Sequence, residues 1–136
     1  MYQKILVPID GSEHSKRALY EAINIAKMTN GTITLLNVQP YRSKLIPPSN
    51  QQSNEATKSI VLTEGQRLVQ AGGASVNTLL IEGSNVVDQI IKTAKEKNFD
   101  LIVLGARGLS KFEELLLGSI SHGVLEKAPC PVIVTR

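Results

Sequence analysis

The sequence predicts an α/β fold, with one open parallel sheet covered by helices on both faces. Five short apolar segments alternate along the chain with four segments of helical period, and this alternation is typical of right-handed βαβ units. The length of 136 residues fits a single domain over residues 1–136. Apolar residues make up 42% and charged residues 20% of the chain, a balance that argues against a disordered, collagen-like or coiled-coil protein.

The predicted strands are nearly unbroken apolar runs, rich in leucine or β-branched residues and bounded by turn-forming residues. Such runs predict strands that are buried on both faces, because helices cover both sides of a parallel sheet. The five segments are Ile5–Ile9, Thr32–Val38, Val76–Ile81, Leu101–Leu104 and Val132–Val134.

The first helix begins after Gly11-Ser12, where Ser12 is a natural N-cap, and it ends near Asn30-Gly31, a good C-terminal stop. One apolar stripe recurs along it at helical spacing, and we expect this stripe to be buried. The stripe consists of Ala18, Leu19, Ala22, Ile23 and Ala26. The prolines and polar residues after the second strand indicate a mobile surface loop at about Tyr41 to Asn54.

Three further helices are expected, each with its own pattern and stop. The second has a weaker helical pattern, at Ala56, Ile60, Glu64 and Leu68, and is closed by Gly72-Gly73. The third is capped by Ser84 and Asn85, and its expected buried stripe is Val86, Val87, Ile90, Ile91 and Ala94. The fourth begins near Gly118-Ser119, stops before Pro129, and has an expected buried stripe of Ile120, Val124 and Leu125.

The composition excludes several classes of protein. The net charge is +3, but lysine and arginine are scattered along the chain, so we expect no nucleic-acid partner. Aromatic residues make up 4% of the chain, too few for a platform on which bases stack. The single cysteine, Cys130, allows neither an internal disulfide nor a thiolate metal cage. With no signal-peptide pattern and no apolar run near the roughly 18–20 residues of a membrane span, we expect a cytoplasmic protein without membrane contact.

The ligand site is expected at the carboxyl ends of the strands, where open parallel sheets bind their ligands. Gly105 and Gly108 follow the fourth predicted strand, and together with Gly118 and Ser119 they form the pattern Gly-x2-Gly-x9-Gly-Ser. Glycines after a strand let the backbone approach a ligand closely, and a helix that begins at Gly118 offers N–H groups and a positive dipole end to phosphate. Alternatively, the glycines make only a turn and a tight contact between helix and sheet, which would explain Gly105 but not the whole set.

Three side chains add polar groups to this predicted phosphate site. Arg107 contributes a positive charge, and the hydroxyls of Ser119 and Ser121 are further candidate donors. Asp10 ends the first predicted strand, where a carboxylate could bind a ribose hydroxyl or help to hold a magnesium ion beside a phosphate. The alternative for Asp10 is a turn or capping residue before the first helix.

Several catalytic and nucleotide-binding motifs do not occur. There is no Gly-x4-Gly-Lys-[Ser/Thr], no Gly-x-Gly-x-x-Gly and no Gly-x-Ser-x-Gly, so a P-loop NTPase, a Rossmann dinucleotide site and an α/β-hydrolase have no support. His14 and His122 lack the spacing of a metal pair, and we interpret each as a helix-surface or capping residue. His122, one turn into the last helix, is a weak candidate for proton transfer.

The chain resembles the universal stress protein family over its whole length. The resemblance is carried by the segment Lys4–Ser12, by the glycine motif and by the closing segment Ala128–Val134. The glycine motif matches the ATP-binding branch of that family. The resemblance implies a fold similar to that of the adenine nucleotide alpha hydrolases, with five parallel strands in the order 3-2-1-4-5 and the first and fourth strands side by side.

The resemblance also implies a set of residues that contact ATP or AMP. Asp10 would lie near the ribose, and the backbone of Val38 would recognise adenine. Ala106 departs from the small hydroxyl residue common at its position, which would remove one polar contact. The implied contact residues are Pro8, Ile9, Asp10, Val38, Gly105, Arg107, Gly108, Gly118, Ser119, Ile120 and Ser121.

The last strand is predicted to lie at an edge of the sheet, because Pro131 has no N–H to donate to a ladder. The resemblance implies a homodimer through residues 131–136, although a monomer with an unpaired edge is the alternative. Our leading hypothesis is a dimeric ATP-binding regulator of the stress response. The rivals are a slow ATPase or an autophosphorylating enzyme, with Ser119 or Ser121 as acceptor, and an interaction module that binds no nucleotide.

Overall fold

The computed structural model describes residues 1–40, 59–107 and 118–136. Within them, strands and helices alternate from the first element to the last. The strands are β1 (Lys4–Pro8), β2 (Thr32–Gln39), β3 (Ser75–Glu82), β4 (Leu101–Gly105) and β5 (Val132–Thr135). The helices are α1 (Glu13–Thr29), α3 (Ile60–Ala71), α4 (Val86–Glu96) and α5 (Ser119–Lys127). The loop predicted at Tyr41 to Asn54, together with Ala56 and Gly108, lies outside the described residues.

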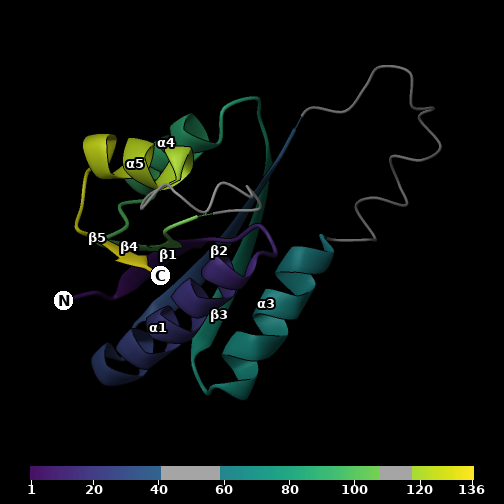
Figure 1. The fold of residues 1–136 in the computed structure, drawn as a ribbon. Coiled ribbons are helices and arrows are strands. Elements are labelled where there is room, and N and C mark those ends of the chain that lie inside the picture. The colour runs from purple at the N-terminus through teal and green to yellow at the C-terminus, as the bar shows by residue number, and fades with distance from the viewer. Residues whose placement is uncertain (41–58, 108–117) are drawn as a thin grey trace.

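All five strands form one parallel sheet in the order β3-β2-β1-β4-β5, which confirms the predicted α/β fold (Figure 1). At the centre, Ile5 of β1 is aligned with Ile33 of β2 on one side and with Leu101 of β4 on the other. The strand order places the ends of β1 and β4 side by side although the two segments are far apart in the sequence. β5 is an edge strand, as predicted.

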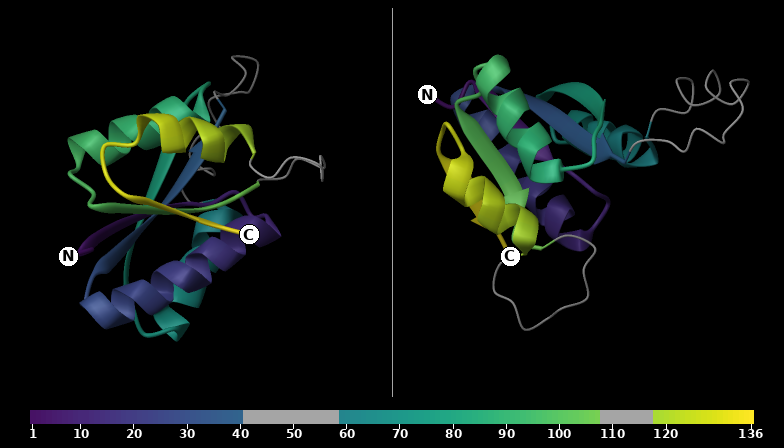
Figure 2. Two further views of the ribbon diagram at one scale, coloured as in Figure 1. Left: turned by 60° about the vertical axis from the view of Figure 1, so that its left-hand side comes forward. Right: turned by 90° about the horizontal axis from the view of Figure 1, so that it is seen from above.

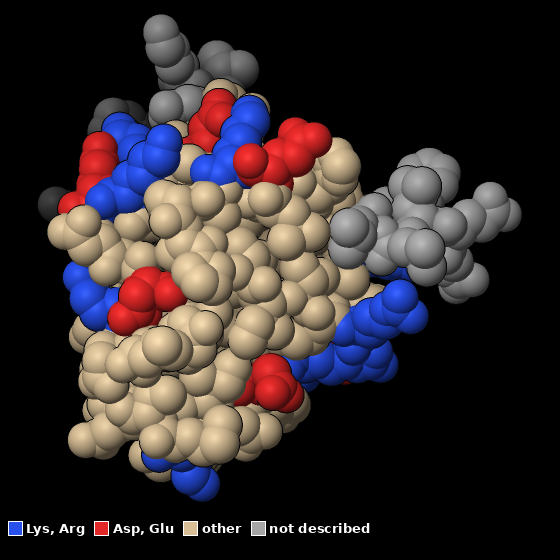
Figure 3. All heavy atoms as spheres, turned by 90° about the vertical axis from the view of Figure 1, so that its left-hand side faces the viewer, with Lys and Arg blue, Asp and Glu red and all other residues tan. Residues whose placement is uncertain are grey.

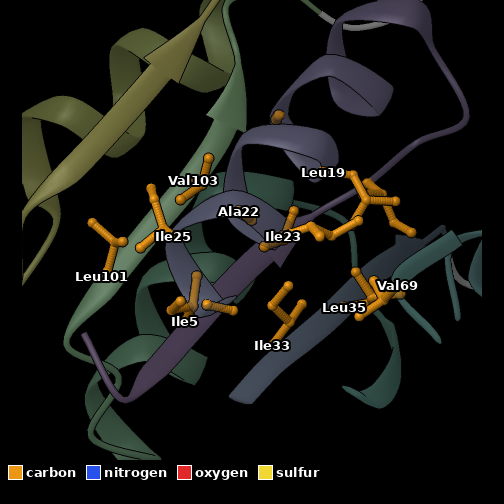
Figure 4. Close-up of a cluster of buried hydrophobic side chains, with 14 of the residues drawn as sticks. Ile5, Leu19, Ala22, Ile23, Ile25, Ile33, Leu35, Val69, Leu101 and Val103 are labelled. Atoms are coloured by element: carbon orange, nitrogen blue, oxygen red, sulfur yellow. The ribbon is translucent and has the colours of Figure 1, made fainter. Parts of the chain in front are cut away.

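Helices cover both faces of the sheet, with α1 and α3 on one face and α4 and α5 on the other (Figure 2). The side chains of a strand alternate between the two faces, so Ile5 and Val7 join the core under α1 while Leu6 joins the core under α4. Side chains from α1, α3 and the strands meet in the first of these cores (Figure 4). The central strands are therefore buried on both faces, which explains their unbroken apolar runs.

Two of the helices begin at the caps expected from the sequence. The hydroxyl of Ser12 accepts a hydrogen bond from the N–H of Ser15 at 3.2 Å, and the side chain of Asn85 accepts one from the N–H of Asp88 at 3.1 Å. Asn30, with a φ of 59°, ends α1 in the left-handed conformation. All five residues of the apolar stripe predicted for α1 are buried.

The buried faces of α3 and α5 differ from the prediction. In α3 the sheet side carries Leu62, Gly65 and Val69, whereas Ile60 is 85% exposed. In α5, Val124 is buried as predicted, but Ile120 and Leu125 are exposed. Both helices bury only a narrow stripe, and the neighbouring elements, rather than the apolar content of the helix alone, determine which stripe it is.

No helix in the described ranges is both long enough and apolar enough to cross a membrane.

Candidate functional site

A cavity of about 570 Å³ lies at the carboxyl ends of the central strands, within the size range of small-molecule sites. The chain leaves β1 toward α1 on one face of the sheet and leaves β4 toward α5 on the other, so the cavity lies where the connections diverge. It is lined by ten of the eleven predicted contact residues: Pro8, Ile9, Asp10, Val38, Gly105, Arg107, Gly118, Ser119, Ile120 and Ser121. The eleventh, Gly108, lies outside the described residues.

Six further lining residues were not among the predicted contact residues: Ser15, Leu36, Val86, Ile90, Leu104 and Ala106. Most of them are apolar, and they belong to β2, α4 and β4, so they give the cavity an aliphatic wall. Leu36 could have been predicted from the sequence, because it lies two residues before Val38 and therefore on the same face of the same strand. Val86 and Ile90 are recognisable only once α4 is placed over that face.

Asp10 takes part in the turn that starts α1. Its Oδ1 accepts a hydrogen bond from the N–H of Ser12 at 2.9 Å, and its own N–H lies 3.5 Å from the hydroxyl of Ser15. The turn interpretation of Asp10 is therefore correct, and it is compatible with a ligand role because the carboxylate also lines the cavity. A carboxylate has two oxygens, so Oδ2 can still accept a further hydrogen bond or bind a cation.

The backbone of Val38 faces the cavity rather than a neighbouring strand. Along β2, residues point their N–H and C=O alternately to the two sides: Leu36 accepts from the N–H of Ile9 at 2.8 Å, and Gln39 accepts from the N–H of Gly83 at 2.9 Å. Val38 therefore points to the same side as Leu36, beyond the end of β1. Among the described residues, neither backbone group of Val38 has a hydrogen-bond partner on that side.

A buried polar cluster lies directly behind Val38. The side-chain Nδ2 of Asn37 donates to the carbonyl oxygen of Ile9 at 2.9 Å. Its Oδ1 accepts from the hydroxyl of Ser59 at 2.8 Å and from Nε2 of Gln39 at 3.3 Å. Ser59 also accepts from the N–H of Leu62 and so caps α3. The cluster thus joins the ends of β1 and β2 to the start of α3.

Gly105 is required by packing between a helix and the sheet. A Cβ at this position would lie 2.6 Å from the carbonyl carbon of His14 and 2.7 Å from its oxygen, closer than such atoms approach. The alternative interpretation of Gly105, a tight helix–sheet contact, is therefore correct for this glycine. His14 lies in the first turn of α1, and its Nδ1 is buried without a hydrogen-bond partner in the described part of the chain.

The N-terminus of α5 forms one wall of the cavity. The first helical hydrogen bond is donated by the N–H of His122 to the carbonyl of Gly118 at 3.0 Å, so the N–H groups of Ser119, Ile120 and Ser121 precede the helical ladder. Gly118 is the N-cap, and no side chain caps the helix there. This helix end therefore presents backbone donors and a positive dipole end to the cavity.

The start of α5 is held against the end of β4 by two hydrogen bonds to one carbonyl. The oxygen of Ala106 accepts from the N–H of Gly118 at 2.6 Å and from the hydroxyl of Ser121 at 2.7 Å. Ser121 is only 2% exposed, and its hydroxyl also lies 3.0 Å from the carbonyl of Gly118. In this arrangement Ser121 uses its hydroxyl proton within the protein, so its backbone N–H is the donor that it offers to the cavity.

The lining has one acid, Asp10, and one base, Arg107, among the described residues. No group of three or more acidic, histidine or cysteine side chains there could hold a metal ion alone. The described groups with shifted pKa values lie away from the cavity. The hydrogen bond with Arg67 lowers the pKa of Glu64, and burial, with the charge of Asp100, raises the pKa of the Cys130 thiol.

The model of the universal stress protein family matches residues 1–136. The chain belongs to the universal stress protein family. The universal stress protein MJ0531 of Methanocaldococcus jannaschii is 32% identical over all of this chain and 83% of its own length. Among solved structures, UspA from Lactobacillus plantarum superposes with a TM-score of 0.83 at 31% identity, covering 99% of this chain and 98% of its own.

A second solved universal stress protein was crystallised in complex with cAMP. It superposes on this chain with a TM-score of 0.79 at 27% identity, covering 99% of this chain and 97% of its own. The family and the strand order that the resemblance implied are thus confirmed. The contact roles of the individual residues stay predictions.

His122 lies on the outside of this universal stress protein. Its side chain is 65% exposed, its Nε2 is 3.1 Å from Oε1 of Glu126, and it is not part of the cavity lining. The interpretation of His122 as a helix-surface residue is therefore correct. His14 is different, because it packs against the end of β4 rather than on a free surface.

Proposed function

We propose that this universal stress protein binds an adenine nucleotide, ATP or AMP, in the cavity at the carboxyl ends of β1 and β4. The observation that carries the proposal is the convergence, in one cavity, of the N-terminus of α5, Arg107, Asp10 and the backbone edge of Val38. These groups match the three parts of a nucleotide: the phosphates, the ribose and the base. The related structure with bound cAMP supports a nucleotide as the class of ligand.

In this proposal the phosphates lie against the N–H groups of residues 119–121 and near Arg107. The ribose lies near Asp10, and adenine lies against the aliphatic wall with its polar edge at Val38. Asp10 would also hold a magnesium ion brought by the nucleotide. Mg²⁺ is commonly bound by one or two carboxylates together with the phosphates of the ligand, so a lone aspartate suits this role.

Calorimetry with ATP, AMP and cAMP tests the proposal. We expect binding by the intact chain and a loss of affinity in Gly118→Val, because even the Cβ of a side chain there would lie 3.2 Å from the oxygen of Ala106. Leu125→Ala, an exposed position farther along α5, is the matched control and should bind like the parent. Mass spectrometry of the purified, unheated protein would identify any nucleotide that copurifies. If none of the three nucleotides binds, the chain is an interaction module and the proposal is wrong.

We propose binding without efficient turnover. Asp10 already accepts a hydrogen bond in a turn, and His122 lies outside the cavity lining, so neither forms a paired acid and base there. Incubation with ATP labelled in its γ-phosphate should release and transfer no more label than Gly118→Val does. Release above that level would favour the slow ATPase, and label on Ser119 or Ser121 would favour the autophosphorylating enzyme.

We further propose that two copies pair through the edge strand β5, within residues 131–136, in the cytoplasm. The carbonyl of Pro131 accepts from Ile102 of β4, and that of Thr135 accepts from Ala106, directly after β4. Odd-numbered residues of β5 therefore face β4, and the backbone groups of Val132 and Val134 face outward. The side of the molecule that carries β5 and α5 has a broad uncharged centre with most charges at its margin (Figure 3). An unpaired edge beside an uncharged surface suits strand pairing.

Sedimentation of Val134→Pro tests the dimer. Proline at this position removes an outward N–H and leaves the ladder with β4 intact, so we expect a folded monomer. Ile133→Pro, which removes a group that faces β4, should instead reduce stability. A parent chain that sediments as a monomer, or a Val134→Pro variant that remains a dimer, would contradict pairing through β5.

The cavity and β5 are directly connected, which gives bound nucleotide a route to the dimer. The N–H of Ala106, a lining residue, donates to the carbonyl of Thr135 at 2.6 Å. We propose that bound nucleotide alters the shape or the partners of the dimer through this connection and so acts in the stress response. Sedimentation with and without ATP should show a change in dimer affinity, and equal values would contradict this coupling.

A further inference from the structure

The ladder between β1 and β2 stops one hydrogen bond early. Its last bond runs from the N–H of Ile9 to the carbonyl of Leu36 at 2.8 Å. In a regular parallel ladder the next bond would run from the N–H of Val38 back to the carbonyl of Ile9. That bond is absent, although the structure describes both Val38 and Ile9.

The carbonyl of Ile9 accepts a hydrogen bond from a side chain instead. Nδ2 of Asn37 donates to it at 2.9 Å, from the residue directly before Val38. Asn37 is only 7% exposed and therefore has little freedom to turn away. A side-chain donor thus replaces the backbone donor that would have closed the ladder.

The orientation of the Asn37 amide is determined by its partners. The carbonyl of Ile9 can only accept, so the NH₂ group must face it. On the other side, Oδ1 accepts from the hydroxyl of Ser59 at 2.8 Å and from Nε2 of Gln39 at 3.3 Å. The donor end and the acceptor end of the Asn37 amide are therefore both fixed by its hydrogen-bond partners.

Among the described residues, the N–H and the C=O of Val38 have no hydrogen-bond partner, and Val38 lines the cavity. A donor beside an acceptor is complementary to the N1 and 6-amino groups of adenine. A 6-oxopurine in the same position would place a donor against the N–H and an acceptor against the C=O, so both contacts would be repulsive. A site with such a pair discriminates by leaving the wrong ligand's groups unpaired.

We infer that Asn37 is a positioning residue that, by donating to the carbonyl of Ile9, keeps the N–H of Val38 from closing the ladder and thereby makes the site specific for 6-aminopurine nucleotides over 6-oxopurine nucleotides. The inference rests on the proposed function, because it assumes that a purine nucleotide occupies the cavity. Asn37 does not contact the ligand in this scheme, and it acts through Ile9 and Val38.

The first test needs no ligand and follows amide hydrogen exchange of Val38 by NMR. In the parent chain we expect rapid exchange at Val38 and slow exchange at Leu36, whose backbone is in the ladder. In Asn37→Asp, which retains the size and the acceptor of the side chain but loses the donor, the N–H of Val38 becomes the available donor for Ile9. We expect its exchange to slow at least about tenfold. Asn77→Asp, at an exposed position of β3, is the matched control and should leave Val38 unchanged.

The second test compares ATP with inosine triphosphate, which differs from ATP at N1 and the 6-position, by calorimetry. We expect the parent chain to prefer ATP by roughly tenfold or more and Asn37→Asp to bring the ratio close to one. Gly118→Val, at the phosphate end, should weaken both nucleotides by the same factor. Asn37→Leu serves as a second donor-free variant if the aspartate does not fold.

The outcomes separate this inference from the proposed function. If the parent chain binds neither nucleotide, the proposed function is wrong, and the specificity inferred here is wrong with it. If ATP binds and the ATP preference is the same in the parent and the donor-free variants, Asn37 does not set specificity and only the inference is overturned. Unchanged exchange at Val38 in both donor-free variants would overturn it as well, whatever the ligand does.

Discussion

The hydroxyl of Ser121 donates to the carbonyl oxygen of Ala106 at 2.7 Å, and this contact joins α5 to the end of β4. The two residues lie fifteen positions apart in the sequence, on either side of the segment that leads into α5. The contact fixes the N-terminus of α5 relative to the sheet. Any ligand held by that helix end is therefore positioned by the sheet as well.

Ser121→Ala should reduce the stability of the fold. Loss of one buried hydrogen bond costs about 1 kcal/mol in the free energy of unfolding, and the N–H of Gly118 still satisfies the Ala106 carbonyl. Urea denaturation measures the change. Ser119→Ala, at the exposed neighbouring serine, should stay within about 0.5 kcal/mol of the parent, so equal losses in the two variants would contradict this role of Ser121.

Gly105→Ala should be destabilising by about 1–3 kcal/mol, the usual cost of overpacking a well-packed contact. The added methyl group would lie 2.6 Å from the carbonyl carbon of His14, so the start of α1 would have to move away from β4. Gly118→Ala offers the comparison, because its nearest neighbour, the oxygen of Ala106, would be 3.2 Å away. Thermal denaturation should show a larger loss of stability for Gly105→Ala than for Gly118→Ala. The reverse order would show that the start of α1 can move away from β4 at little cost.

His122→Ala should change neither stability nor nucleotide affinity appreciably. The side chains of His122 and Glu126, which are in contact, are each more than half exposed, and exposed polar pairs contribute little. We expect a change below about 0.5 kcal/mol in the free energy of unfolding and an unchanged ATP isotherm. Weaker ATP binding in this variant would place His122 in the site after all.

Cys130 should react slowly with iodoacetamide in the folded protein. Burial, with the negative charge of Asp100, raises the pKa of the thiol, so less thiolate is present near pH 8 than in an unfolded chain. The reaction rate in buffer, measured against the rate in urea over pH 7 to 10, tests this. Equal rates would mean that the thiol is not protected.

The same shift predicts how stability depends on pH. A raised pKa in the folded state means that the folded chain keeps its thiol proton to a higher pH than the unfolded chain does. The contribution to stability is complete below the unfolded pKa and is lost as the pH rises through the folded value. Cys130→Ser should therefore lose less stability than the parent between pH 8 and 10, by urea denaturation at each pH.

Local patterns in the sequence were sufficient to predict the strands, the helices and most of the contact residues that line the cavity. The apolar runs predicted every strand to within one residue at each end. Strands that are buried on both faces are nearly continuous apolar segments, so their ends are clear in the sequence. Ser12 and Asn85 could be named as caps because capping involves only residues a few positions apart. The carboxyl-end rule brought distant residues such as Asp10 and Gly118 to one cavity.

What the sequence alone determined, then, was the class of fold and the general location of the site, since both follow from periodicity and from residues that neighbour one another in the chain. The tertiary structure decided which side of a helix is buried, as at Ile60, and which groups are already occupied, as with the hydroxyl of Ser121. It also decided that Asn37 replaces a ladder bond beside Val38. These features depend on contacts between segments far apart in the chain, where distances of a few tenths of an ångström determine whether a hydrogen bond forms.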